Sequence, residues 1–118
     1  MTGKVLVVDD DKSILEVIKI VLEDAGFEVV TVLGGANIEQ EVEKTLPNLI
    51  LIDIWMSGVD GREVTNRLKS NPKTKAIPVI VISAHNDTAK MAKEARADGF
   101  LAKPFDIDEL IKTVKKYV

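Results

Sequence analysis

The sequence predicts an α/β fold, a five-stranded parallel β-sheet with helices on both faces. Short apolar runs rich in β-branched residues alternate with longer stretches whose apolar residues recur every three or four positions. The short runs hardly alternate between polar and apolar residues, which is typical of strands covered on both faces. The chain has 118 residues, of which 46% are hydrophobic, so we expect one domain with a substantial core.

The first helix is expected between the first two strands. Ser13 and Glu16 have the spacing of a capping box at its start, Asp11 is expected to cap the same end, and Gly26 fits a left-handed residue at its end. The expected strands are residues 5–8, 29–32, 49–52, 79–82 and, more weakly, 100–102. The apolar positions of the first helix are Ile14, Leu15, Ile18, Val21, Leu22 and Ala25.

The other helices follow the same periodicity. Pro47 should end the second helix, while Asp60 and Asp106 should begin the third and the fifth. The fourth, near residues 87–97, has only alanines and Met91 on its apolar side, so we expect it to be the most loosely held. The residues expected to face the core in the second, third and fifth helices are Ile38, Val42, Leu46, Val64, Leu68, Ile107, Leu110, Ile111 and Val114.

Five β-α units in series give an open sheet through right-handed crossovers. For five strands we expect the flavodoxin-like order 2-1-3-4-5, in which ligands bind beyond the carboxyl ends of the strands. Polar residues follow four of these ends: Asp9 and Asp10, then Asp53, Ser83 and Lys103. They should converge on one cavity.

Three carboxylates in one cavity repel one another, and a cation would relieve the repulsion. A ligand set of oxygens without His or Cys suits a hard ion, so Mg²⁺ is the expected cofactor, with Mn²⁺ as an alternative. An acid flanked by Mg²⁺, a lysine and a hydroxyl has what phosphoryl transfer requires, because these groups position the phosphoryl group and neutralise its charge.

The segments VLVVDDD, LILIDIWMSGVDG, VIVISA and FLAKPF resemble the receiver domain of bacterial two-component response regulators, and the resemblance covers the whole chain. It implies a single receiver domain over residues 1–118, with no output domain in this chain. The implied roles are phosphoacceptor for Asp53, metal ligands for Asp9, Asp10, Asp53 and the Trp55 backbone carbonyl, phosphoryl-binding lysine for Lys103, switch residues for Ser83 and Phe100, and a cis bond between Lys103 and Pro104.

The resemblance also implies that two further positions tune dephosphorylation. Trp55 lies two residues after Asp53, and His85 lies two after Ser83. The Trp55 indole could cover the phosphoryl group and slow hydrolysis, whereas His85 could orient a water and oppose this shielding. The family usually has proline at the position of Ser57, and its absence should leave the loop after Asp53 freer.

The resemblance implies a signalling module rather than an enzyme, one that catalyses only its own phosphorylation and dephosphorylation. The implied partners are a sensor histidine kinase or phosphotransfer protein, a downstream target or a missing output domain, and a second copy after phosphorylation. A net charge of −3 predicts no direct binding of nucleic acid. The absence of cysteine, of long apolar runs and of a signal-peptide pattern predicts a cytoplasmic protein away from membranes.

Other functions remain open at this point. A haloacid-dehalogenase-type phosphatase also has an Asp after an apolar strand, but it needs a second acid where Trp55 stands. A flavin- or dinucleotide-binding domain would have a G-x-G-x-x-G loop after the first strand, where this chain has acids. A receiver-like scaffold that is never phosphorylated and phosphorylation on His85 are two more alternatives. The sequence also does not distinguish a stand-alone receiver from part of a longer regulator.

Overall fold

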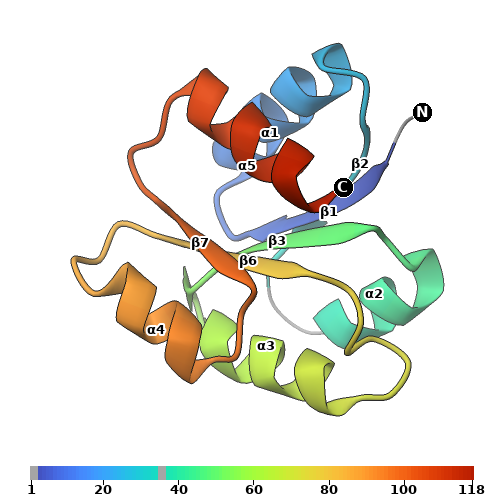
Figure 1. The fold of residues 1–118 in the computed structure, drawn as a ribbon, viewed down its shortest axis with the longest axis vertical. Coiled ribbons are helices and arrows are strands. Elements are labelled where there is room, and N and C mark those ends of the chain that lie inside the picture. Colours follow the sequence, from blue (N-terminus) through green and yellow to red (C-terminus); the bar gives the residue numbers. More distant parts are fainter. Residues whose placement is uncertain (1–2, 35–36) are drawn as a thin grey trace.

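The computed structural model describes residues 3–34 and 37–118. Five parallel strands form one sheet in the order β2-β1-β3-β6-β7 (Figure 1). This confirms the expected order, since these are the five predicted strands. Their bounds are β1 Lys4–Asp9, β2 Glu28–Leu33, β3 Leu49–Asp53, β6 Val79–Ser83 and β7 Gly99–Ala102.

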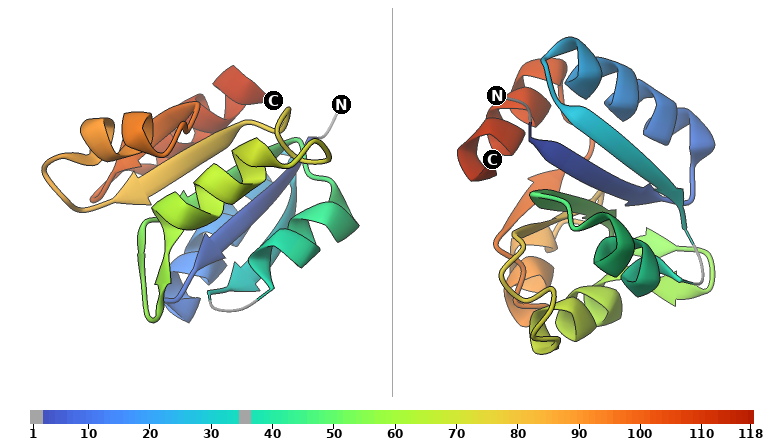
Figure 2. Two further views of the ribbon diagram at one scale, coloured as in Figure 1. Left: turned by 90° about the horizontal axis from the view of Figure 1, so that it is seen from below. Right: turned by 90° about the vertical axis from the view of Figure 1, so that its right-hand side faces the viewer.

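Helices cover both faces of this sheet, as predicted (Figure 2). Val5 and Val7 face α1 and α5, whereas Leu6 and Val8 face α2, α3 and α4. The central strands are therefore buried on both sides, which explains their unalternating apolar sequences. In the described part of the chain, no helix combines the length and hydrophobicity needed to cross a bilayer. The helices are α1 Lys12–Asp24, α2 Ile38–Thr45, α3 Gly61–Ser70, α4 Thr88–Glu94 and α5 Ile107–Tyr117.

Acidic side chains cap three of the helices. The Asp11 carboxylate accepts hydrogen bonds from the backbone amides of Ser13 at 2.9 Å and Ile14 at 3.4 Å, so Asp11 is the N-cap of α1. The capping box expected at Ser13 is wrong, because Ser13 already lies inside the helix. Asp60 and Asp106 cap α3 and α5, as predicted.

Three other expectations about the helices are wrong. Leu46 is exposed because α2 ends at Thr45, and the left-handed Leu46, with φ of 46°, turns away from the core. Ile107 is exposed because it is the first residue of α5, ahead of the buried Leu110. The fourth helix is shorter than expected, and the left-handed Arg96, with φ of 63°, follows its end.

A short antiparallel hairpin that the sequence did not predict follows β3. It consists of β4 Trp55–Met56 and β5 Val59–Asp60, with Trp55 paired to Asp60. Gly58 has a φ of 74° at its turn, a conformation that favours glycine. Strands of two residues carry no readable periodicity, which is why the pattern of apolar residues missed them.

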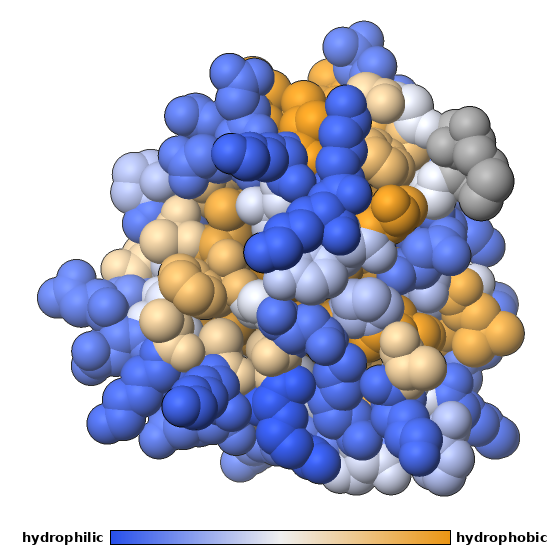
Figure 3. All heavy atoms as spheres, viewed as in Figure 1, coloured by the Kyte–Doolittle hydropathy of each residue, from blue (hydrophilic) through white to orange (hydrophobic). Residues whose placement is uncertain are grey.

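An apolar groove with a basic rim runs over β7 between α4 and α5. Figure 3 shows its pale orange floor on the left of the molecule, surrounded by hydrophilic side chains. The floor includes Ala89, Ala92, Ala97 and Phe100, and the rim includes Lys93, Lys112 and Lys116. Phe100 is 48% exposed here rather than part of the core.

Candidate functional site

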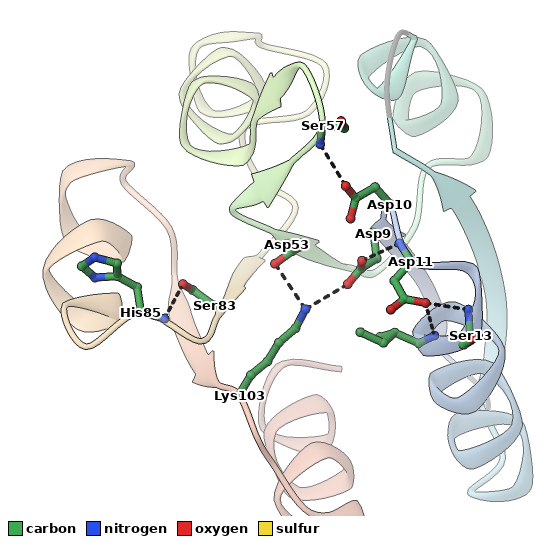
Figure 4. A network of polar contacts seen from close by, with 10 residues as sticks. Asp9, Asp10, Asp11, Ser13, Asp53, Ser57, Ser83, His85 and Lys103 are labelled. Atoms are coloured by element: carbon green, nitrogen blue, oxygen red, sulfur yellow. Dashed lines mark hydrogen bonds and ion pairs between the residues drawn. The ribbon is translucent and has the colours of Figure 1, made fainter.

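Three carboxylates meet at the carboxyl ends of the two central strands β1 and β3. Asp9 ends β1, Asp10 follows it, and Asp53 ends β3. One oxygen of each lies within 4.8 Å of the others (Figure 4). Asp9 and Asp53 are buried, at 1% and 5% exposure, whereas Asp10 is exposed. The strand order brings these residues together, because β1 and β3 are hydrogen-bonded neighbours.

Lys103 enters the same cluster from the end of β7. Its Nζ lies 3.3 Å from Oδ2 of Asp9 and 3.4 Å from Oδ1 of Asp53, and Figure 4 shows the ammonium pointing between them. The backbone N–H of Lys103 donates to the carbonyl of Ser83 at 2.9 Å, and the Lys103–Pro104 peptide bond is cis. One ammonium thus contacts two buried acids.

The electrostatics of the cluster single out Asp53. Burial raises the pKa of its carboxyl from the ordinary 3.8 to about 6, while Lys103 opposes the rise and Asp9 and Asp10 add to it. Desolvation is therefore a larger cause of the raised pKa than repulsion between the acids. Since three carboxylates share one ammonium, a second positive charge would stabilise the ionised site.

The donor set at this cluster fits a hard divalent cation. The oxygens of Asp9, Asp10 and Asp53 are close enough to share an ion. Asp9 accepts from the Asp11 N–H through Oδ1 and Asp10 accepts from the Ser57 N–H through Oδ2, both at 2.9 Å. Among the described residues, the second oxygen of each accepts no backbone N–H. Carboxylate oxygens with no His or Cys suit Mg²⁺.

The hairpin β4–β5 is tied to the acids at both of its sides. The Ser57 N–H binds Asp10, and the Gly61 N–H donates to the carbonyl of Ile54 at 2.8 Å. A Cβ on Gly61 would lie 2.3 Å from the carbonyl oxygen of Asp53, so only glycine allows this approach. Sequence reasoning assigned no role to Gly61. Its place in V-D-G at a helix start was the available signal.

Ser83 is buried beside Asp53, because Asp53 pairs with Ile82 across β3 and β6. Its Oγ accepts a hydrogen bond from the backbone N–H of His85 at 3.0 Å. The hydroxyl of Thr88, a buried residue that sequence reasoning missed, donates to the carbonyls of His85 at 2.5 Å and of Ser83 at 3.4 Å. The Ser83 main chain is therefore joined to the start of α4.

Trp55 and His85 lie beside each other, whereas Phe100 lies apart. The two rings of Trp55 and His85 have centroids 6.2 Å apart, and the indole is 49% exposed. Phe100 pairs with Val81 on β7 and lines the groove between α4 and α5. The structure thus collects the predicted acids and lysine in one cluster, with Ser83 at the end of β6, Trp55 at the start of β4 and His85 on the loop after β6.

Comparison with known proteins identifies this arrangement. The family profile described as the response regulator receiver domain matches residues 5–115. The chain belongs to this family. PilG of Pseudomonas aeruginosa is 33% identical to this receiver domain, over 98% of the chain and 87% of PilG. The phosphate regulon transcriptional regulatory protein PhoB of Rhizobium meliloti is also 33% identical, over 98% of the chain but 52% of PhoB. The receiver domain thus spans about half the length of that relative.

Solved structures share the fold of the receiver domain. A putative response regulator from Chloroflexus aurantiacus has a TM-score of 0.91 and 34% identity, with 99% of this chain and 98% of that one covered. The chemotaxis protein CheY4 of Vibrio cholerae also has a TM-score of 0.91, at 28% identity over the full length of both chains. Receiver domains are signalling proteins of two-component systems rather than classical enzymes, and they bind Mg²⁺ at a cluster of aspartates. In this chain Asp9, Asp10 and Asp53 form a group that could hold a metal ion.

Proposed function

We propose that this receiver domain accepts a phosphoryl group on Asp53 from a histidine kinase, a phosphotransfer protein or a small phosphodonor. The single observation that carries the proposal is the arrangement around Asp53. Its buried carboxylate lies 3.4 Å from the Lys103 ammonium and shares a cluster with Asp9 and Asp10. A nucleophile, a positive charge and an incomplete ligand set for a divalent cation therefore lie in one cluster.

The chemistry follows from the charges. An oxygen of Asp53 attacks the phosphorus, the bond from phosphorus to the donor atom breaks, and the bonding pair leaves with the donor. Lys103 neutralises part of the charge on the transferring group from its place between Asp9 and Asp53. Mg²⁺ bound by Asp9, Asp10, Asp53 and the Trp55 carbonyl would neutralise phosphoryl oxygens and help to hold them in line. Mn²⁺ suits the same oxygen ligands.

The signal would leave the site through Ser83. Its hydroxyl now accepts from the His85 N–H, and turning toward a phosphoryl oxygen would remove that acceptor. The loop between β6 and α4 would follow, because Thr88 ties the start of α4 to the carbonyls of Ser83 and His85. Phe100 would then rotate inward from the groove and change the surface of α4, β7 and α5. Moving such an equilibrium from nearly off to nearly on takes about 5.5 kcal/mol.

The receiver would act on other proteins through that surface. Its output would be a downstream target or the output domain of a longer protein, with a phosphorylation-dependent dimer as a further form. We place it in the cytoplasm, where a histidine kinase would meet it and where a chain without cysteine is at no disadvantage.

The test is labelling with a small phosphodonor. With acetyl phosphate and Mg²⁺, the wild type should gain the mass of one phosphoryl group, and hydroxylamine should remove it because the product is an acyl phosphate. Asp53→Asn should gain nothing, while Asp108→Asn, which changes an exposed acid on α5, should label like the wild type. A wild type that stays unlabelled would favour a scaffold, and a label that survives alkali, which cleaves an acyl phosphate, would favour His85.

A further inference from the structure

The indole of Trp55 contacts two polar neighbours, Arg62 and His85. The guanidinium of Arg62, at the start of α3, lies over the ring with its Cζ 4.9 Å from the centroid. The imidazole of His85 lies on the loop after β6, with ring centroids 6.2 Å apart. Trp55 is two residues from Asp53, so their Cα atoms are at most about 7 Å apart. The indole therefore lies between the start of α3 and the loop after β6 that carries His85.

Arg62 is itself fixed by Asp60. Its Nη2 donates to Oδ2 of Asp60 at 2.8 Å and its Nε donates to Oδ1 at 3.1 Å, which gives a forked pair. The pair lowers the pKa of the Asp60 carboxyl, mainly through the Arg62 hydrogen bond. Asp60 also caps α3 and pairs with Trp55 across the hairpin. Asp60 thus binds Arg62 through its side chain and pairs with Trp55 through its backbone, which places the Arg62 guanidinium over the indole.

The hairpin β4–β5 and the start of α3 both contact the acids. Ser57 binds Asp10, and Gly61 packs directly against the backbone of Asp53. A cation over an aromatic face is attracted to it, and the attraction limits how far the ring can swing away. We propose that Arg62, oriented by Asp60, is a positioning residue that keeps the Trp55 indole over the mouth of the site and so restricts the access of water to the phosphoryl group.

This inference rests on the proposed phosphorylation of Asp53 and concerns the lifetime of the product. In hydrolysis a water oxygen attacks the phosphorus and the bond from phosphorus to the Asp53 oxygen breaks. The bonding pair stays on the carboxylate, and the protons of the water go to phosphate and solvent. His85 is less suited to help, because its Nδ1 already accepts from the Asp87 N–H at 3.2 Å and only Nε2 is left to orient a water.

The decisive experiment measures the decay of phospho-Asp53 after labelling with acetyl phosphate and Mg²⁺ and removal of the donor. Arg62→Ala should decay roughly two- to fivefold faster than the wild type, the range that corresponds to one cation–π contact near the surface. Arg62→Lys, which keeps the cation and loses the fork, should fall between them. The matched control is Arg67→Ala, since Arg67 lies on the same helix but pairs with Glu39 on the surface.

Two further measurements separate positioning from general destabilisation. In a Trp55→Ala background, Arg62→Ala should cause no additional acceleration, because it acts through the ring. Trp55 is the single tryptophan of the chain, so quenching of its fluorescence by acrylamide reports its exposure in the unphosphorylated protein. Quenching should increase in Arg62→Ala and in Asp60→Asn, which retains a capping side chain for α3, and stay unchanged in Arg67→Ala.

Opposite results overturn the inference in distinguishable ways. A wild-type lifetime in Arg62→Ala, or effects of Arg62→Ala and Trp55→Ala that multiply in the double variant, would reject the positioning role while leaving phosphorylation intact. Unchanged acrylamide quenching in Arg62→Ala would reject it as well. A wild type that takes no label would instead reject the proposed function, and this inference with it.

Discussion

The sheet has an amino edge, formed by the amino ends of its parallel strands, and a carboxyl edge, formed by their carboxyl ends. Each edge carries a lysine–carboxylate cluster, and the two clusters differ in whether the lysine charge balances the carboxylate charge. At the amino edge, Oδ2 of Asp98 accepts from the Lys69 ammonium at 2.5 Å and from the Val79 N–H at 2.8 Å. Lys69 also donates to the carbonyl of Ile77 at 2.9 Å. At the carboxyl edge, the single ammonium of Lys103 contacts Asp9 and Asp53, and Asp10 adds a third carboxylate to the cluster.

The difference is one of charge rather than of hydrogen bonding. Among the described residues, no buried side-chain nitrogen or oxygen lacks a hydrogen-bond partner. At the amino edge one cation meets one anion, so the cluster is complete and joins α3 to the start of β7. At the carboxyl edge the negative charge exceeds the positive, and a bound cation would reduce this imbalance. The same residue types thus form a charge-balanced cluster at one edge and an unbalanced one at the other.

Removing the acid of the complete cluster should have the largest effect on stability. Asp98→Ala leaves the Lys69 ammonium, whose side chain is 11% exposed, and the Val79 N–H without their shared acceptor. We expect a loss of about 3 kcal/mol in the free energy of unfolding, measured by urea denaturation. Asp24→Ala, at an exposed acid of α1, should stay within about 0.5 kcal/mol of the wild type. Equal midpoints for the two variants would contradict the assignment.

Removing Asp53 from the cluster at the carboxyl edge should have the opposite effect and raise the free energy of unfolding. A carboxyl whose pKa rises from 3.8 to about 6 on folding binds more protons in the folded state between these values. Wild-type stability should therefore fall as the pH rises through that window and stay lower above it, by roughly 3 kcal/mol at most. Because an amide still occupies the site, we expect Asp53→Asn to be about 2 kcal/mol more stable than the wild type at pH 8 without metal. The gain should vanish near pH 4, and a gain independent of pH would contradict this cause.

Stabilisation by bound Mg²⁺ should also distinguish the two clusters. An ion that binds only the folded protein stabilises it by about 1.4 kcal/mol at ten times its dissociation constant. We expect Mg²⁺ to raise the thermal midpoint of the wild type and of Asp98→Ala equally, because Asp98 lies at the other edge. Asp10→Asn should gain less, since it loses one ligand of the cluster. An equal gain in Asp10→Asn would place the ion elsewhere, and chelation with EDTA should reverse the effect.

The sequence predicts the fold where one physical signal dominates. β1, β3 and β6 are buried on both faces, so their apolar runs appear without alternation. Since parallel strands point the same way, their order brings Asp9 and Asp53 to one edge. The predictions failed at the ends of helices, where the exact first or last residue decides whether a side chain is buried. Apolar spacing alone cannot show that Leu46 lies past the last turn of α2 or that Ile107 lies before the buried face of α5.

The surroundings of the site are less predictable because backbone contacts create them. The Ser57 N–H donates to Asp10 and the Arg62 guanidinium lies over Trp55, yet the spacing of these residues in the sequence predicts neither contact. The close approach of Gly61 to Asp53 depends on a turn at Gly58. The roles of Asp53, Ser83, Lys103 and Phe100 stay predictions that labelling and mutation have to test.

The smallest expected effect comes from a third charge pair, Arg67 and Glu39. It tests how far burial explains the strength of the charge pairs in the first two clusters. Nε of Arg67 lies 2.6 Å from Oε1 of Glu39, and the Arg67 side chain is 54% exposed, against 11% for Lys69; the acids Glu39 and Asp98 are equally exposed. A double-mutant cycle on this pair should give a coupling of at most about 0.5 kcal/mol, and it should weaken further in concentrated salt. The same cycle on Lys69 and Asp98 should give a larger coupling that salt changes little, because Lys69 is mostly buried. Similar couplings for the two pairs would mean that short distances, rather than desolvation, set the strength of charge pairs in this protein.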